Sequence, residues 1–298
     1  MKILNFGSLN IDKTYNVKHF VQPGETILSL GFREFCGGKG LNQSIALARA
    51  GAETYHAGII GYDGAELKKA LDTAGVHTQW LRELPEPSGH AMIEINEEGQ
   101  NRIIVSSGTN GKVEEGYINE ILTHFGEGDF LLVQNEISGI AYIMEQASEK
   151  GMKIIFNPSP INDELFTYPL DMVDIFVLNE TEGRALAGME DGDAEYILEK
   201  LSGKYPKAEI VLTLGKDGSY YQGKAGRFYQ PAFRVKTVDT TAAGDTFCGY
   251  FIQVYSEGGE PEEALRKAAK ASAIAVSRQG ASPSIPLAEE LLACEMIC

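Results

Sequence analysis

The sequence lacks the features that mark several large classes of protein. Its 298 residues carry 26 Lys and Arg against 42 Asp and Glu, which gives a formal net charge of −16. Without a basic cluster, such a chain repels nucleic acid and anionic membrane surfaces. The N-terminal stretch MKILNFGSLNID is too often interrupted by polar residues to be a signal peptide or a membrane span. We therefore expect a cytoplasmic protein that binds neither nucleic acid nor membranes.

Cysteine is scarce and follows no metal or redox pattern. Cys36, Cys248, Cys294 and Cys298 include no C-x-x-C pair, and no His stands at metal-ligand spacing from them. We interpret all four as reduced, mostly structural thiols.

The common nucleotide-binding signatures are also missing. No Gly-Lys pair is followed by the Ser or Thr of a Walker A loop, and no G-x-G-x-x-G motif occurs. The H-R-D and D-F-G triplets of protein kinases are absent as well. A phosphate-binding loop of these known types is therefore not indicated.

The sequence contains instead an alternation of short apolar runs and helical patterns. The clearest apolar runs, after about residue 52, lie at 130–133, 154–156, 175–178 and 210–212. Helical patterns fit 40–50, 64–75, 140–150, 194–204, 245–256 and 261–277. Runs this short and rich in β-branched or aromatic residues suit strands buried on both faces. The alternation predicts an α/β fold with an open, mainly parallel sheet flanked by helices.

Two stretches break this alternation. Residues 12–36 have no helical period, and residues 89–107 alternate like a hairpin around 97–100. We expect both to be β insertions in one domain that spans 1–298, forming a lid or a dimer surface. An ordinary exposed hairpin is the alternative.

Polar residues stand just past the ends of several apolar runs. They are Glu136, Asn157, Asn179, and Thr213 with Gly215. In open α/β sheets, ligands bind at the carboxyl ends of the strands, so these side chains could line one cleft. Polar residues also end strands for trivial reasons.

The segment 239–246, DTTAAGDT, carries the strongest chemical signal. Its small residues lead directly into a helical pattern, which leaves the backbone N–H groups of Ala242, Ala243 and Gly244 bare. Such amides at a helix N-terminus make an anion site suited to a phosphoryl group in transfer. Asp245 lies beside this site and could accept the proton of an attacking hydroxyl. The alternative is a tight turn in which Asp245 merely caps the helix.

A second glycine-rich turn, GGKGLNQS at 37–44, also opens a helical pattern. Its glycines allow close approach to the backbone, and Lys39 and Asn42 provide polar arms. This combination suits a neutral polyol better than a phosphate.

These two segments resemble the signatures of the ribokinase family of carbohydrate kinases, also called the phosphofructokinase-B family. GGKGLNQS is followed at the expected spacing by Gly51 and Gly61, and residues 239–252 match the second signature. Tyr250 departs from it, because a small residue is usual there, and we expect its bulk to alter helix packing more than chemistry. The resemblance runs from Ile3 to about Pro286. The motifs at 7–12, 23–26, 179–182 and 213–215 fit the ribokinase branch of the family.

The resemblance implies a set of binding residues. The sugar would be bound by Asn10, Asp12, Gly38, Lys39, Gly40, Leu41, Asn42, Glu136 and Asp245. ATP would contact Asn179, Thr213, Leu214, Gly215, Lys216, Asp217, Gly218 and Gly244, with Glu182 placing Mg²⁺ through water. A monovalent cation, K⁺, would be held by Asp239 and Ser284 and by main-chain oxygens of Thr241, Ala275, Arg278 and Gly280. Each of these residues could instead have a purely structural role. Asn10 and Asp12 could end the first strand, Glu182 could cap a helix, and Asp239 could cap its turn.

The resemblance further implies an ATP-dependent sugar kinase that acts on a primary hydroxyl, and D-ribose is the leading candidate for the sugar. Asp245 would be the base, and the amides of residues 242–244 would form the anion hole. A kinase for another ketose, sugar acid or nucleoside is the first alternative, and a non-catalytic sugar-binding regulator is the second. The family also favours a homodimer joined through the lids.

Overall fold

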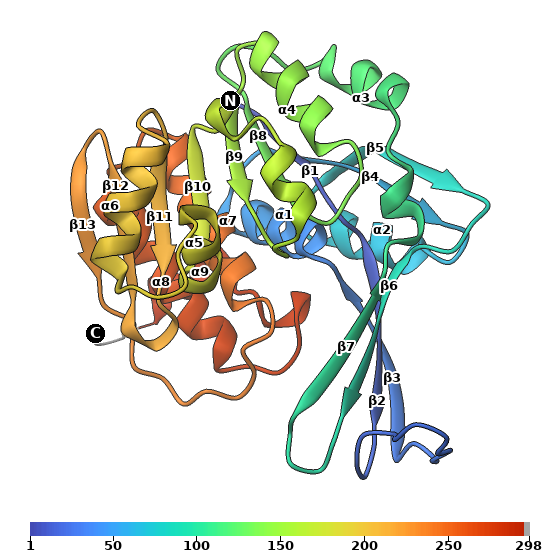
Figure 1. Cartoon of the computed structure of the whole chain (residues 1–298). Coiled ribbons are helices and arrows are strands. Elements are labelled where there is room, and N and C mark those ends of the chain that lie inside the picture. The colour runs from blue at the N-terminus through green and yellow to red at the C-terminus, as the bar shows by residue number, and fades with distance from the viewer. Residues whose placement is uncertain (295–298) are drawn as a thin grey trace.

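The computed structural model describes residues 1–294 and arranges them as a large sheet between helices, with a smaller sheet projecting from it (Figure 1). The strand order of the large sheet is β13-β12-β11-β10-β9-β8-β1-β4-β5. Its strands are β1 (Ile3–Phe6), β4 (Thr54–Gly61), β5 (His77–Leu84), β8 (Phe130–Gln134), β9 (Lys153–Asn157), β10 (Ile175–Asn179), β11 (Glu209–Thr213), β12 (Ser219–Gly223) and β13 (Gly226–Gln230). All neighbouring pairs are parallel except β11 with β12 and β12 with β13. The predicted open, mainly parallel sheet is confirmed.

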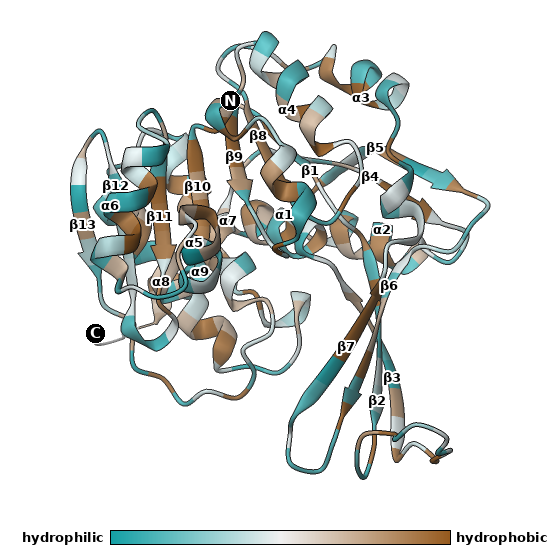
Figure 2. Ribbon diagram, viewed as in Figure 1, coloured by the Kyte–Doolittle hydropathy of each residue, from teal (hydrophilic) through white to brown (hydrophobic). Residues whose placement is uncertain are grey.

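Helices cover both faces of this sheet. One apolar core packs α1 (Lys39–Ala50), α2 (Ala65–Thr73), α7 (Ala243–Ser256), α8 (Pro261–Val276) and α9 (Ala288–Ala293) against one face. A second core packs α3 (Glu115–Leu122), α4 (Ile140–Glu149), α5 (Glu180–Ala187) and α6 (Ala194–Lys204) against the other. Successive strand residues alternate between the two cores, as Ile3 and Leu4 do. This is why the strands are continuous apolar runs, visible as brown ribbon in Figure 2.

The six predicted helices are all present, and their ends differ from the predicted ones by two residues at most. The prediction missed α3 and α5, which have eight residues each. It also missed α9 and the β12–β13 hairpin, which joins the sheet edge immediately before the long connection to α7. Cys36, Cys248 and Cys294 are free thiols, and Cys298 lies outside the described residues. Within residues 1–294, no helix is long and apolar enough to cross a membrane.

Tyr250 lies within α7. Its side chain is buried in the first core, and its hydroxyl donates to the carbonyl of Pro286 (2.8 Å). The unusual bulk is thus accommodated by packing between α7 and the C-terminal segment.

The smaller sheet, here called the lid, has the order β3-β2-β6-β7. Its strands are β2 (Asn10–Asn16), β3 (Gly31–Gly37), β6 (Gly89–Ile95) and β7 (Asn101–Ser106). β2 pairs parallel with β6, and the other two pairs are antiparallel. The lid therefore arises from the two stretches predicted as β insertions, although β2 begins at Asn10, two residues earlier than expected.

Candidate active site

Asn10 and Asp12 lie on the first lid strand, where the lid leaves the large sheet. β1 ends at Phe6, so the interpretation of Asn10 and Asp12 as the end of the first strand is wrong. Asp12 sits directly over Gly37 on β3, where a Cβ atom would come within 2.0 Å of its Oδ2. Gly37 is thus required for the space that the Asp12 carboxylate occupies.

Asn10 is oriented by Asn110, a buried residue that the sequence did not indicate. The Nδ2 of Asn110 donates to Oδ1 of Asn10 (2.7 Å), and Oδ1 of Asn110 accepts from the amide of Leu9 (3.0 Å). Since Oδ1 of Asn10 is taken, its Nδ2 remains as the donor for a ligand. Asn110 lies in a short 3₁₀ turn after β7, a position with no periodic signal in the sequence.

Glu136 is tied to the glycine-rich turn at the start of α1. Its Oε2 accepts a hydrogen bond from the hydroxyl of Ser8 and another from the amide of Lys39 (3.0 Å). Ser8, also missed in the sequence, in turn accepts from the amide of Gly40 (3.2 Å). Glu136, Lys39 and Gly40 are therefore neighbours, which brings together three of the residues that the family resemblance assigned to the sugar. Gly38 immediately precedes the helix with φ 95°, a conformation that favours glycine, and Leu41 is buried beneath the site.

The charges of this site interact strongly. Burial raises the pKa of Asp12 to about 7, and the carboxylates of Glu136 and Asp245 add to the effect. Burial also raises the pKa of Glu136, although Lys39 opposes it. Burial lowers the pKa of the Lys39 ammonium, but the neighbouring carboxylates, Asp245 first, outweigh it and the net direction is upward. The carboxylates of Asp245, Glu136 and Glu182 thus act on the Lys39 ammonium, and Asp12 is a further carboxylate in the same site. Such a concentration of buried acidic groups costs free energy unless a ligand satisfies it.

Asp245 lies at the third position of α7, on the anion turn. Ala242 precedes the helix with φ 58°, the one positive φ among the non-glycine residues of 1–294. The Asp245 carboxylate does not cap the helix, because its oxygens accept from the side chains of Asn42 (3.0 Å) and Gln43 (2.9 Å). The alternative of a simple helix cap is therefore wrong.

The three predicted anion-hole amides differ in their availability. The N–H of Ala243 donates to the carbonyl of Thr240 (3.2 Å). Those of Ala242 and Gly244 have no hydrogen-bond partner within residues 1–294. The left-handed conformation of Ala242 thus produces a turn with free amides at a helix N-terminus.

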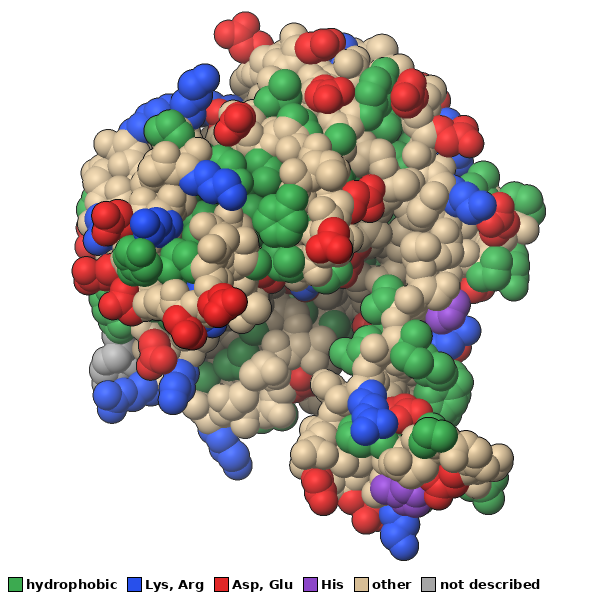
Figure 3. Space-filling model, viewed as in Figure 1, with side chains coloured by type: hydrophobic (Ala, Val, Ile, Leu, Met, Phe, Trp, Pro, Cys, Tyr) green, Lys and Arg blue, Asp and Glu red, His purple; other side chains and the backbone are tan. Residues whose placement is uncertain are grey.

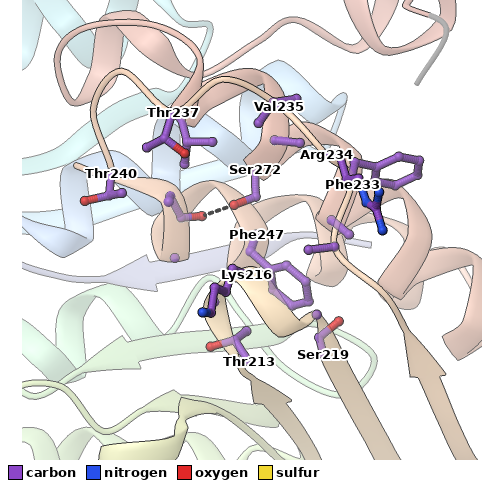
Figure 4. Close-up of a pocket in the computed structure, with 18 residues that line it drawn as sticks. Thr213, Lys216, Ser219, Phe233, Arg234, Val235, Thr237, Thr240, Phe247 and Ser272 are labelled. Carbon is purple, nitrogen blue, oxygen red and sulfur yellow. Dashed lines mark hydrogen bonds between the residues drawn. The ribbon is translucent and has the colours of Figure 1, made fainter. Parts of the chain in front are cut away.

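Two cavities meet at this turn. The larger, about 520 Å³, is lined by Thr213, Gly215, Lys216, Gly218, Ser219, Ala232, Phe233, Arg234, Val235, Thr237, Thr240, Ala243, Gly244, Phe247, Ala269, Ser272, Ala273 and Val276. Figure 4 shows Thr213, Lys216 and Ser219 on the sheet side and Phe247 and Ser272 on the helix side. The sequence predicted the sheet-side lining residues between 213 and 218. It missed the segment from 232 to 237, which has no periodic pattern. Leu214 and Asp217, also predicted, do not line it.

The smaller cavity, about 210 Å³, continues from the larger one toward the start of α1. It shares Thr213, Thr240, Ala243 and Gly244 with the larger cavity. It adds Lys39, Asn157, Val177, Leu178, Asn179, Glu182, Ala242 and Asp245. Lys39 of the glycine-rich turn and Asp245 of the anion turn therefore line the same small cavity, which opens into the larger one.

Glu182 caps α5, so the alternative in which this residue caps a helix is confirmed. Asn179 accepts from the amide of Glu182 (2.9 Å), and the Glu182 carboxylate accepts from both the amide and the Nδ2 of Asn179 (2.9 Å each). Each carboxylate oxygen keeps a lone pair for a water molecule. Within residues 1–294, no group of three or more His, Cys, Asp or Glu could hold a metal ion on its own.

Asp239 joins the anion turn to the loop after α8. One carboxylate oxygen accepts from the amide (2.9 Å) and hydroxyl (2.6 Å) of Thr241, and the other accepts from the amide of Gly280 (3.0 Å). Burial would raise the pKa of Asp239, but these hydrogen bonds lower it below the ordinary value. Ala275 accepts from the amide of Arg278, and the buried hydroxyl of Ser284 donates to Ala281 (2.7 Å). All six predicted cation ligands thus lie in or next to two loops, the one before α7 and the one after α8, which the Asp239 carboxylate connects.

A cavity of about 520 Å³ that meets buried carboxylates and free amides at a helix N-terminus is the arrangement expected of a small-molecule kinase with an α/β fold. The chain belongs to the pfkB family of carbohydrate kinases, whose family model matches residues 1–288. It is therefore a carbohydrate kinase, and the resemblance seen in the two glycine-rich signatures is confirmed.

Similar proteins span the whole chain. The ribokinase of Haemophilus influenzae is 34% identical over 296 residues, which cover 96% of this chain and 95% of that protein. The deoxyribokinase of Salmonella typhi is 29% identical over 297 residues, 97% of each chain. The structure of Arabidopsis thaliana ribokinase complexed with ribose and ATP is 31% identical, with a TM-score of 0.86, and the match covers 98% of this chain and 97% of that one.

Proposed function

We propose that the protein transfers the γ-phosphate of ATP to the primary hydroxyl of D-ribose and so forms ribose 5-phosphate. The observation that carries this proposal is the place of Asp245. Its carboxylate contacts Asn42 on the sugar side, and it lines the smaller cavity together with Gly244 and Asn179 on the nucleotide side. Similarity to ribokinases over the whole chain supports ribose as the substrate. Consumption of ATP fits the cytoplasmic location expected from the sequence.

The sugar hydroxyls would be held by the buried polar groups around the start of the lid. Asp12 and Glu136 would accept hydroxyl protons, and Asn10 would donate through its free Nδ2. The Oδ1 of Asn42 is buried and has no hydrogen-bond partner, so a sugar hydroxyl would supply the missing donor. The backbone of residues 38–41 would approach the sugar where the glycines leave room.

The chemical step needs a base, a phosphoryl acceptor and compensation of charge. Asp245 would take the proton of the sugar hydroxyl. At the same time the hydroxyl oxygen would bond to the γ-phosphorus, and the bond from that phosphorus to the ADP oxygen would break. Lys39 and the free amides of Ala242 and Gly244 would stabilise the negative charge on the phosphoryl oxygens. Mg²⁺ bound to the phosphates would neutralise further charge, with Glu182 holding one of its waters.

Release of ADP, measured over a panel of acceptors, tests the proposed substrate. The panel contains D-ribose, 2-deoxyribose, fructose, a sugar acid and adenosine. We expect the highest kcat/KM with D-ribose. A higher value with 2-deoxyribose would favour the activity of the Salmonella typhi relative, and a higher value with adenosine would favour a nucleoside kinase. Sugar binding without ADP release from any acceptor would favour a regulator.

We also propose that K⁺ binds between the anion turn and the loop after α8. The carboxylate of Asp239, the hydroxyl of Ser284 and several backbone carbonyls in these loops are the hard oxygen ligands that such an ion prefers. The bound ion would fix Asp239 and thereby the tilt of the anion-turn amides. Turnover in Tris buffer at matched ionic strength should be severalfold higher with K⁺ than with Na⁺ or with neither ion. Equal rates under the three conditions would mean that Asp239 only caps its turn.

We further propose a homodimer in which each lid covers the other. The register places Asp12, Phe35, Ala91 and Val105 on one face, with Ile103 two residues further on the same face. Phe35, Ile103 and Val105 are exposed, and Figure 3 shows hydrophobic side chains gathered along the lid where it stands away from the main body. A second lid would bury this face and close over the sugar.

The two faces of β7 provide a matched pair of variants for this dimer. Ile103 is 54% exposed on the Asp12 face, and Ile104 is 64% exposed on the opposite face. Ile103→Glu should make the protein monomeric in light scattering and raise the sugar KM, whereas Ile104→Glu should remain dimeric. A wild-type monomer, or equal effects of the two substitutions, would contradict the arrangement.

A further inference from the structure

Gln43 is a buried amide that contacts the proposed base directly. It lies on α1 next to Asn42, and only 1% of its surface is exposed. Its Nε2 donates to Oδ1 of Asp245 (2.9 Å) and to Oδ1 of Asn157 (3.0 Å). Both amide hydrogens of Gln43 are therefore engaged, one by Asn157 and the other by the Asp245 carboxylate.

One end of this contact is fixed by β9 and β10. Asn157, the last residue of β9, donates its Nδ2 to the carbonyl of Val177 on β10 (2.8 Å). Because a carbonyl can only accept, the Oδ1 of Asn157 must face Gln43 and requires a donor there. A flipped Gln43 amide would place two acceptor oxygens against each other.

The other end is fixed by β1 and β8. The Oε1 of Gln43 accepts from Nε2 of Gln134 (2.8 Å), and the same Nε2 donates to Oδ1 of Asn5 (2.9 Å). Asn5 in turn donates its Nδ2 to the carbonyl of Gly40 (2.8 Å). Each amide in this series has a single orientation that satisfies its neighbours, because the series ends on a backbone carbonyl.

We propose that Gln43 is a positioning residue, which holds Oδ1 of Asp245 in place and leaves Oδ2 to receive the proton of the sugar hydroxyl. This inference rests on the proposed role of Asp245 as the base. Asn42 donates to Oδ2 (3.0 Å), but the unpartnered Oδ1 of Asn42 leaves that amide without a comparable anchor. Oδ2 is thus the oxygen whose surroundings can rearrange when the sugar binds.

Neutral groups suit this role better than charged ones. A Lys or Arg against Oδ1 would stabilise the carboxylate strongly and weaken it as a base, whereas an amide orients the oxygen with no net charge. The series also continues to an uncharged group, since the Asn5 Nδ2 donates to Ser44, which contacts His56, and burial lowers the pKa of His56 to about 4. The amide series behind Oδ1 of Asp245 is therefore polar but uncharged at neutral pH, and the positive charge near this carboxylate comes from Lys39.

Gln43→Met tests the proposal, because Met fills nearly the same volume and makes no strong hydrogen bond. We expect kcat to fall by about 10- to 100-fold, with the KM values for sugar and ATP changing less than about threefold. In the background of Asp245→Asn, the same substitution should have no further effect on kcat. A Gln43→Met variant with wild-type kcat, or one whose loss multiplies with that of Asp245→Asn, would overturn the inference. If Asp245→Asn itself kept its turnover, the proposed base would fail instead.

Two further variants separate positioning from stability. Gln134→Met does not touch Asp245 but frees the Gln43 amide, so it should lower kcat by a smaller factor and again have no effect in the Asp245→Asn background. Tyr221→Phe is the control, because it removes a buried hydrogen bond to Glu209 (2.8 Å), and neither residue lines the cavities at the anion turn. It should lower the melting temperature and leave kcat unchanged. If Tyr221→Phe lowered kcat as Gln43→Met does, the effect of Gln43 would be one of stability alone.

Discussion

Replacing Asp245 by Asn is expected to lower kcat by about 10²- to 10⁴-fold, the usual contribution of a general base. Asn has the same shape, and its Oδ1 can still accept from Gln43. Its Nδ2 would face Asn42, whose unpartnered Oδ1 can turn to accept from it, so the surroundings of the turn should be retained. Its amide cannot take the proton of the sugar hydroxyl. The loss should therefore appear in kcat, measured by coupled ADP release at saturating concentrations of both substrates.

Nucleotide binding provides the control for this variant. ATP would occupy the larger cavity and contact Thr213, Lys216 and Gly244, none of which changes. Calorimetric titration should give an ATP affinity within about threefold of wild type. Turnover close to the wild-type value would reject Asp245 as the base, and a large loss of ATP affinity would assign it to the nucleotide site.

Asp12→Ala should produce the second-largest effect, on the KM of the sugar. A carboxylate that accepts two hydroxyls makes two charge-assisted hydrogen bonds, and the loss of both corresponds to about 10²- to 10³-fold in affinity. The KM for ATP should change little, because Asp12 lines neither cavity at the anion turn. Steady-state kinetics with each substrate varied in turn measures both constants.

Glu34→Ala is the matched control for Asp12→Ala. Glu34 is an exposed carboxylate on the adjacent lid strand β3. In the strand register it stands opposite Lys13, the neighbour of Asp12, so its side chain lies on the other face of the lid from Asp12. Its removal should leave both KM values unchanged. If the two variants raised the sugar KM equally, or if Asp12→Ala raised both KM values together, Asp12 would support the lid rather than bind sugar.

The raised pKa of Asp12 also predicts how the sugar KM depends on pH. Burial, Glu136 and Asp245 favour the protonated form, so the carboxylate that accepts hydroxyls is present above about pH 7 and is lost as the pH falls through that value. The wild-type sugar KM should rise about tenfold from pH 8 to pH 6, and the rise should be absent in Asp12→Ala. A wild-type KM that is constant over this range would contradict the assignment.

The sequence was sufficient for the parts of the structure whose signal is local. Continuous apolar runs predicted the strands because both of their faces are buried, and the small residues of 239–246 predicted a turn that opens a helix. It did not indicate Ser8, Asn110 or Gln134, since their importance arises from hydrogen bonds to residues distant in the chain. The larger cavity was only half predicted, because the segment from 232 to 237 has no periodic pattern and is placed by tertiary packing, in which Phe233 contacts the first core.

The product formed from D-ribose and ATP tests the central claim most directly. We predict a single sugar phosphate whose phosphorus couples to the two protons on C5 in ³¹P and ¹H NMR, formed in a one-to-one ratio with ADP. This result requires that the primary hydroxyl reach Asp245 while the ring hydroxyls are held near Asp12 and Glu136. A phosphate on any other ribose oxygen, or ADP formed without a sugar phosphate, would contradict the account.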